Sequence, residues 1–209
     1  MPPEETTAPA ARPAGPRDGT RAARADAQRN RDKLVRAATA AFTAAGGAVP
    51  LEVIAGEAGV GIGTLYRHFP TRDALVEAVY AAELDDVTSS VTALLRQHAP
   101  DVAMRAWMER YAAFVATKQA MAQTLRASWT SGRISTPATR ERITAAVAAI
   151  LAHGAEAGTL RADIDPSDVT LLLMGTLLAA TADDAPGRTG RLLDLVLDAL
   201  RPAQGPTAG

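Results

Sequence analysis

Residues 62–69 combine side chains that can contact base pairs with side chains that must be buried. If it is helical, at about 100° per residue, Ile62, Leu65 and Phe69 fall within about 60° of one another and form a narrow apolar stripe. Arg67 lies nearly opposite Leu65 on the same helical wheel. An arginine there can donate two hydrogen bonds to guanine O6 and N7, and the hydroxyl of Thr64 can meet another base edge. The residue types therefore favour contact with the major groove of DNA.

Neighbouring residues are suited to phosphate contacts, which position a protein on DNA without reading its sequence. Gly63 lets a backbone N–H approach a phosphate, and the ring donors of Tyr66 and His68 lie on the two flanks of the predicted helix. Thr71 and Arg72 open the next helix, whose N-terminal amides can bind a further phosphate. The alternative is a pair of short packed helices with a polar surface. Spacing, turn and side-chain chemistry together favour DNA binding.

The residues just before this segment supply its support. A short helix with one apolar face is predicted because apolar residues recur at i, i+3, i+4 and i+7, namely Leu51, Ile54, Ala55 and Ala58. Residues 59–61, Gly-Val-Gly, then interrupt it. Two short helices joined by a glycine-bearing turn are the layout of a helix-turn-helix.

Segment 59–75 reads GVGIGTLYRHFPTRDAL and resembles the signature of the TetR (tetracycline-repressor-like) family of transcription regulators. The resemblance covers roughly residues 28–80, and beyond them it rests on helical layout. It implies a repressor that binds a palindromic operator on double-stranded DNA as a homodimer and leaves it when a small-molecule effector binds among the middle helices. Two departures occur. Pro50 replaces a Ser or Thr cap that is common in the family, and Gly61 with Ile62 replaces a common Ser-Lys or Ser-Arg pair. We therefore expect fewer contacts to the DNA phosphate backbone at this end.

The N-terminal region is predicted to contain a basic arm and a DNA-binding domain. Residues 1–25 are rich in Pro, Ala, Gly and Arg without periodicity, which predicts a flexible arm that either remains solvated or tracks phosphates. A first helix is predicted over residues 26–45, before a Gly-Gly pair, with Phe42 in the small core. Together with the helix-turn-helix it makes a three-helix domain over residues 26–72.

The remainder is predicted to be a helical effector-binding and dimerisation domain over residues 73–201, followed by a flexible tail at 202–209. Apolar periodicity and proline positions predict helices over residues 71–96, 101–131 with a bend near 118–120, 137–158, from 166, and from 186 or 187 to 202. The first of these has no break, so it would link the DNA-binding end mechanically to the rest. No β pattern or internal repeat occurs, so the predicted fold class is all-α with about nine helices.

The middle of this domain holds aromatic and methionine side chains at helical spacing. Trp107, Tyr111 and Phe114 recur at i, i+4 and i+7, and such residues form apolar, adaptable cavity walls with a few polar donors. Core packing is the alternative for any single one of them. The resemblance implies an effector among these helices, and the apolar wall favours a hydrophobic or amphipathic one. The predicted effector-binding residues are Met104, Trp107, Met108, Tyr111, Phe114, Met121, Leu125, Trp129 and Met174.

The last two predicted helices are apolar on nearly all sides, over residues 171–178 and 192–200. Each must therefore be covered twice, once by the chain's own core and once by another surface. A second copy related by twofold symmetry would supply that surface through a four-helix interface, which the resemblance also implies. A monomer with a deeply buried helical hairpin is the alternative. The predicted dimerisation residues are Leu173, Leu177, Leu193 and Leu197.

Composition agrees with a DNA-binding protein despite an overall charge of −1. Residues 1–72 carry 10 Lys and Arg against 7 Asp and Glu, whereas residues 73–209 carry 12 against 16, so the basic end holds the helix-turn-helix. The absence of cysteine excludes disulfides and thiolate metal sites, and with three histidines no metal or cofactor is expected. No signal peptide or long apolar run is found, so we expect a cytoplasmic protein without membrane contact.

Two other classes stay open at this point. A helical-bundle enzyme would need an activated nucleophile or an acid–base pair, but His98 and His153 have no recognisable partner in the sequence. An interaction protein that kept the fold without regulated operator binding would be expected to lose Arg67, Thr64 or Tyr66, and all three are present. We therefore predict a DNA-binding regulator without enzymatic activity.

Overall fold

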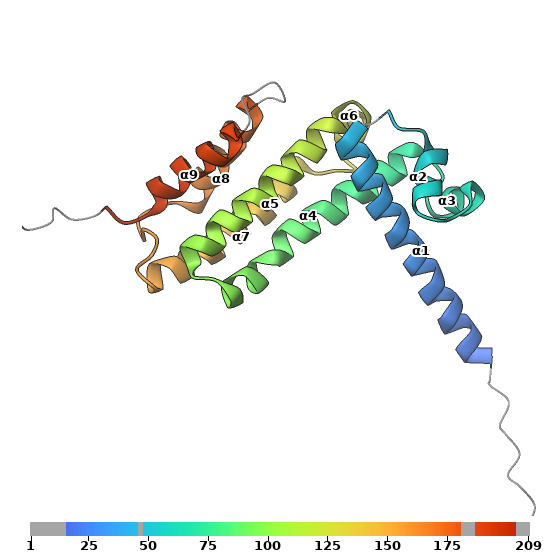
Figure 1. Cartoon of the computed structure of the whole chain (residues 1–209), viewed down its shortest axis with the longest axis horizontal. Coiled ribbons are helices and arrows are strands. Elements are labelled where there is room, and N and C mark those ends of the chain that lie inside the picture. Colours follow the sequence, from blue (N-terminus) through green and yellow to red (C-terminus); the bar gives the residue numbers. More distant parts are fainter. Residues whose placement is uncertain (1–15, 46–47, 181–186, 204–209) are drawn as a thin grey trace, which may run out of the picture.

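The structure, a computed structural model, describes residues 16–45, 48–180 and 187–203. Every regular element in these ranges is an α-helix, which confirms the predicted all-α class (Figure 1). The helices are α1 (Pro16–Ala45), α2 (Leu51–Glu57), α3 (Ile62–His68), α4 (Arg72–Gln97), α5 (Pro100–Ala120), α6 (Ala122–Thr130), α7 (Thr136–Glu156), α8 (Pro166–Ala179) and α9 (Arg188–Leu200). Among these helices none has the length and apolar character needed to cross a bilayer.

Several helices begin where capping side chains and prolines place them. Thr71 Oγ1 accepts a hydrogen bond from Ala74 N at 3.1 Å at the start of α4, and Asp165 Oδ1 accepts one from Ser167 N at 2.7 Å at the start of α8. Helices α5, α7 and α8 each carry a proline in the first turn, where no intrahelical N–H bond is lost. The unbroken helix predicted after Thr71 is confirmed as α4, and the predicted bend falls at Met121, between α5 and α6.

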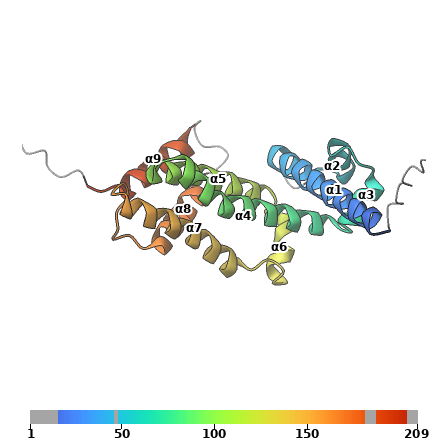
Figure 2. The ribbon, with the colours of Figure 1, turned by 90° about the horizontal axis from the view of Figure 1, so that it is seen from below.

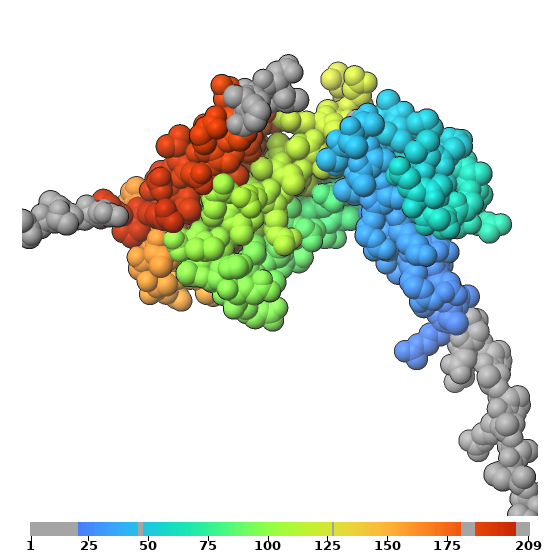
Figure 3. Space-filling model, in the orientation of Figure 1, coloured from blue at the N-terminus to red at the C-terminus, as the bar shows by residue number. Residues whose placement is uncertain are grey.

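Helix α1 begins earlier than predicted. It starts at Pro16 rather than at residue 26, so residues 16–25, which were predicted as part of the arm, are helical. They contain helix-forming Ala and Arg but lack apolar periodicity, and residues 21–29 are accordingly exposed. In Figure 3 the part of α1 drawn in dark blue projects from the body of the molecule. The rest of the predicted arm, 1–15, and most of the predicted tail, 204–209, lie outside the described residues.

Helices α4, α5 and α7 run side by side through the middle of the molecule, with α8 packed on α7 and α9 packed on α5 (Figures 1 and 2). The side chains in their shared core include Trp107, which is fully buried. Its indole Nε1 donates a hydrogen bond to Val87 O at 3.1 Å, so the one polar atom of this side chain is satisfied inside the core. The apolar side chains of α4 are likewise buried, including Leu75, Val79, Leu84, Val87, Val91 and Leu94.

Helices α1, α2 and α3 form a three-helix unit at the other end of the molecule (Figure 1). Its fully or almost fully buried side chains are Leu34, Ala38, Phe42, Ile54, Leu65 and Phe69. Helix α1 also packs on α4 and α5, where the hydroxyls of Thr43 and Thr117 lie 3.1 Å apart. The helix-turn-helix is therefore attached to the helical body through α1 as well as through α4.

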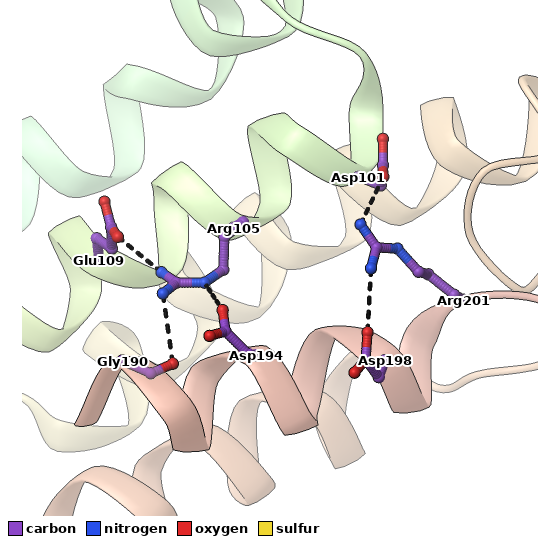
Figure 4. Close-up of polar contacts among 7 residues, drawn as sticks. All are labelled: Asp101, Arg105, Glu109, Gly190, Asp194, Asp198 and Arg201. Atoms are coloured by element: carbon purple, nitrogen blue, oxygen red, sulfur yellow. Dashed lines mark hydrogen bonds and ion pairs between the residues drawn. The ribbon is translucent and has the colours of Figure 1, made fainter. Parts of the chain in front are cut away.

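Two arginines hold α9 against α5 (Figure 4). Arg105 on α5 donates from Nε to Asp194 Oδ1 at 2.6 Å and from Nη2 to Gly190 O at 3.3 Å. Arg201, directly after α9, donates from Nη2 to Asp101 Oδ2 at 3.0 Å. These contacts from both ends of α9, added to its buried leucines, determine which side of the helix faces outward.

Candidate DNA-binding surface and ligand cavity

Helix α3 packs on the N-terminal core through few side chains. Leu65 is fully buried, and Phe69, directly after the helix, is 1% exposed. Ile62 is 37% exposed, so its predicted place in the buried stripe is wrong. Periodicity predicts the direction in which a residue points, but Ile62 is the first residue of a seven-residue helix and lies at the edge of the packed surface.

The five predicted contact residues of α3 lie together on this largely exposed helix. Gly63, Tyr66 and Arg67 are exposed, and Thr64 and His68 are half-buried. Within the described part of the chain, the Arg67 guanidinium makes no hydrogen bond or ion pair, so its donors are available to an external partner. This arrangement meets the chemical requirement for base and phosphate contacts.

The two predicted contact residues after α3 have structural roles. Thr71 caps α4 through its hydroxyl, as described above. Arg72 is half-buried, and its Nη2 donates a hydrogen bond to Val49 O, in the loop before α2. A phosphate contact by Arg72 would have to compete with this bond.

Arg31 on α1 is a residue that the sequence reasoning missed. Its Cζ lies 4.6 Å from the ring centroid of Phe69, which is a cation–π distance. The contact braces the C-terminal end of α3 against α1. Its position three residues before the buried Leu34 was the available signal, because residues i and i+3 share a helix face.

A cavity of about 300 Å³ lies among α5, α6, α7 and α8, at the lower end of the range of about 300–1,000 Å³ that is typical of ligand pockets. Its lining residues are Tyr111, Phe114, Val115, Lys118, Gln119, Ala122, Trp129, Thr136, Thr139, Arg140, Ile143, Thr170, Met174 and Leu178. Four of the nine predicted effector-binding residues are among them: Tyr111, Phe114, Trp129 and Met174.

The other five predicted effector-binding residues do not line this cavity. Met104, Trp107, Met108, Met121 and Leu125 are at most 1% exposed and belong to the packed core. Helical spacing places a side chain on the inward face, but it does not distinguish a face that meets another helix from a face that meets a cavity. The polar part of the lining, including Lys118 and Arg140, was missed for the same reason.

Aromatic rings connect the core, the cavity and α4. Trp107 and Tyr111 stack with centroids 5.5 Å apart, and Tyr111 and Phe114 follow at 6.2 Å. Phe114 then meets the ring of Tyr80, on α4, at 5.5 Å. A ligand that displaces Phe114 or Tyr111 would therefore press on α4.

A polar contact joins α4 to the end of α6. Ser128, which is 1% exposed, donates from Oγ to Glu77 Oε1 at 2.5 Å, and Arg133 donates from Nε to the same oxygen at 2.6 Å. Burial raises the pKa of Glu77, but the hydrogen bonds from Ser128 and Arg133 and the charge of Arg133 outweigh it and lower that pKa. Because Trp129 follows Ser128 directly, this contact lies next to the cavity wall.

Comparison with known proteins identifies the family. Residues 34–79 match the family "Bacterial regulatory proteins, tetR family", and residues 99–202 match the family "Transcriptional regulator SbtR-like, C-terminal domain". The TetR transcriptional regulator SCO0520 from Streptomyces coelicolor is 43% identical, with a TM-score of 0.77 over 83% of this chain and 99% of that chain. This chain belongs to the TetR family.

A second TetR-family structure, a transcription regulatory protein from Mycobacterium vanbaalenii, is 31% identical, with a TM-score of 0.67 over 86% of this chain and 99% of that chain. Comparison with curated proteins gives no match. Members of the TetR family are DNA-binding transcription regulators and not enzymes. The resemblance and the predicted fold class, an all-α protein with an N-terminal helix-turn-helix and a C-terminal helical domain, are thus confirmed.

The exposed apolar surface of this TetR-family chain differs from the predicted one. The predicted dimerisation residues Leu173, Leu177, Leu193 and Leu197 are at most 5% exposed within one protomer, so they pack in the chain's own core and not on its exposed surface. Other leucines of α8 and α9 are exposed instead, by 49–64%: Leu171, Leu172, Leu178 and Leu195. Because both helices are apolar on two sides, the sequence did not distinguish the side that faces the chain's own core.

Proposed function

We propose that this TetR-family regulator represses transcription as a homodimer on a palindromic operator, and that it releases the operator when a small-molecule effector fills the cavity. Helix α4 is the observation that carries this proposal. It is one unbroken helix that begins at the helix-turn-helix and meets the surroundings of the cavity through Glu77 and Tyr80. A displacement at the cavity therefore moves the DNA-binding end of the same element.

In this proposal α3 enters the major groove. Arg67 and Thr64 read base edges, while Gly63, Tyr66 and His68 contact phosphates. The exposure of this helix and the absence of a partner for Arg67 among the described residues support this assignment. Bacterial DNA lies in the cytoplasm, which is where we place the activity.

The homodimer forms through the four exposed leucines of α8 and α9. Large exposed apolar side chains on two helices that pack on each other are a marker of association, and twofold symmetry would bring two copies of this surface together. Leu178 also lines the cavity, so the proposed interface and the proposed effector site share α8.

The switch requires that the effector prefers the conformation that does not bind DNA. A dimer reads two half-sites one helical turn apart, about 34–36 Å, so a small change in the separation of the two α3 helices prevents simultaneous docking. A coupling free energy of about 1–3 kcal/mol would lower operator affinity about 5- to 150-fold, and operator DNA would weaken effector binding by the same factor.

Selection of the operator from random double-stranded DNA with the purified full chain tests the proposal. The expected result is enrichment of a near-palindromic sequence with half-sites one turn apart, bound by two copies of the chain. No enrichment, with a folded protein, would favour an interaction protein that keeps the fold without operator binding. Enrichment of an asymmetric site bound by one copy would refute the dimeric mode.

A further inference from the structure

The charges in the cavity are all of one sign. Of the described residues that line it, only Lys118 and Arg140 carry a formal charge, and neither Asp nor Glu is among them. Most other lining side chains are apolar, including Phe114, Ile143 and Met174. An apolar cavity with two cations and no acid has a positive potential, which selects against cationic ligands.

Lys118 extends from α5 and is half-buried. Its Nζ lies 5.3 Å from the ring centroid of Trp129, and within the described part of the chain no carboxylate pairs with it. Burial lowers the pKa of this lysine, because desolvation disfavours the ammonium. An anion in the cavity would remove that cost by pairing with the ammonium.

Arg140 extends from α7, another helix of the lining, and its positive charge interacts electrostatically with the phenol of Tyr111. Burial raises the pKa of Tyr111 to about 12, and the charge of Tyr80 adds to it, while the charge of Arg140 lowers it. Tyr111 is therefore a neutral O–H donor at physiological pH. Its hydroxyl has no hydrogen-bond partner among the described residues. The oxygen is not fully buried, so it can donate a hydrogen bond to a ligand in the cavity.

We infer that the cavity binds a small organic carboxylate, with the anionic group facing Lys118 and Arg140 and an apolar body against Phe114, Ile143 and Met174. The inference rests on the proposed function, because it names the chemical class of the effector. Cationic and carbohydrate effectors are disfavoured, the first by charge and the second by the apolar wall. The cavity volume of about 300 Å³ limits the ligand to a small molecule.

Calorimetric titration of the full chain with matched pairs of ligands tests the inference. Suitable probes are 4-phenylbutyrate, 2-naphthoate and decanoate, each compared with its primary amide, together with 4-phenylbutylamine as the cationic counterpart. A carboxylate of the panel is expected to bind at least about tenfold more tightly than its amide, since a hydrogen bond to a charged group contributes about that factor or more. Equal affinity of acid and amide in every pair, preference for the amine, or no binding by any carboxylate would overturn it.

Two variants assign the preference to the cavity. Lys118→Met and Arg140→Gln are each expected to weaken carboxylate binding about tenfold and to change amide binding less than about twofold, whereas Lys118→Arg retains the preference. Arg126→Gln is the matched control, because Arg126 is an exposed cation of α6 outside the cavity lining. Unchanged carboxylate affinity in both cavity variants would overturn the inference. Arg140 is exposed, so Arg140→Gln gives a result even if Lys118→Met does not fold.

These titrations contain no DNA, so the two proposals fail separately. Operator binding without carboxylate binding would leave the repressor proposal standing and refute the effector class. Carboxylate binding that does not change operator affinity would support the effector class and refute release by that ligand.

Discussion

Arg67 and Arg72 are both cations near the DNA-binding end, but the fold gives them different surroundings. Arg67 is exposed without a partner in the described part of the chain, whereas Arg72 donates to Val49 O. Arg67→Ala should cost about 1–3 kcal/mol per half-site on operator DNA and relax base preference, with unchanged thermal stability. Arg72→Ala should lower the free energy of unfolding by about 1 kcal/mol because a part-buried carbonyl loses its donor. Titrations on operator and random DNA, with urea unfolding, measure both.

Equal losses on operator and random DNA would show that Arg67 contacts phosphate only. For Arg72, an unchanged unfolding free energy together with a salt slope lowered by about one unit would assign it to phosphate instead.

Gly154 allows the end of α7 to pack against Leu160. A Cβ at residue 154 would lie 2.5–2.7 Å from three side-chain atoms of Leu160, which is 2% exposed. Gly154→Ala is therefore expected to destabilise the fold by about 1–3 kcal/mol, although alanine is the better helix former by about 1 kcal/mol. Gly56→Ala is the control, because no atom lies within 4 Å of its added Cβ. Urea unfolding that ranks Gly154→Ala as stable as Gly56→Ala would refute the packing argument.

At the scale of elements, the bond of Ser128 and Arg133 to Glu77 joins α6 to α4. The folded-state pKa of Glu77 is lowered, so its carboxylate stabilises the fold above the unfolded pKa of about 4.3, and this contribution is lost as pH falls through the folded value. Glu77→Gln should lower the free energy of unfolding by about 1 kcal/mol at pH 7 and by less near pH 3.5.

Glu141→Gln serves as the control for Glu77→Gln, because Glu141 is exposed on α7 and has no ion pair within the described residues. Urea unfolding of both variants at the two pH values gives the comparison. A difference between Glu77→Gln and wild type that is the same at both pH values would show that the charge of Glu77 does not join the two helices.

At the scale of the whole molecule, the exposed leucines of α8 and α9 form the interface of the proposed dimer. Leu195 is 64% exposed, so Leu195→Glu should leave the protomer folded but weaken the dimer at least about 100-fold, since a carboxylate would be buried without a partner. Operator affinity should fall with it, because one half-site has too few contacts. Light scattering measures the oligomeric state, circular dichroism shows whether the protomer is folded, and titration with operator DNA gives the affinity.

Thr92→Glu provides the comparison for Leu195→Glu, since it adds a carboxylate at an exposed position of α4, which lies away from α8 and α9. Leu197→Glu should instead unfold the protomer, because Leu197 is 5% exposed. A folded Leu195→Glu variant that remains dimeric with full operator affinity would place the interface elsewhere.

Local chemistry allowed much of the fold and of α3 to be predicted from the sequence. Prolines, glycines and the Thr71 cap act on residues within one helical turn, so most helix boundaries in the described ranges followed from neighbours in the chain. The exception is the start of α1, which lacks apolar periodicity and whose residues 21–29 are exposed. Arg67 was assigned correctly to an exposed position because seven residues of one helix already define opposite faces.

Tertiary structure alone decided which inward residues meet a cavity and which apolar side faces outward. Trp107 and Phe114 have equivalent helical spacing, yet Trp107 is packed in the core while Phe114 lines the cavity, because what an inward side chain meets depends on the helices packed around it. Leu195 and Leu197 lie on opposite apolar sides of α9, and only the packing of α9 on α5 decides which of the two sides is buried. Lys118 and Arg140 come from two helices and share one cavity only after packing, since periodicity determines the direction of a side chain but not what it meets there.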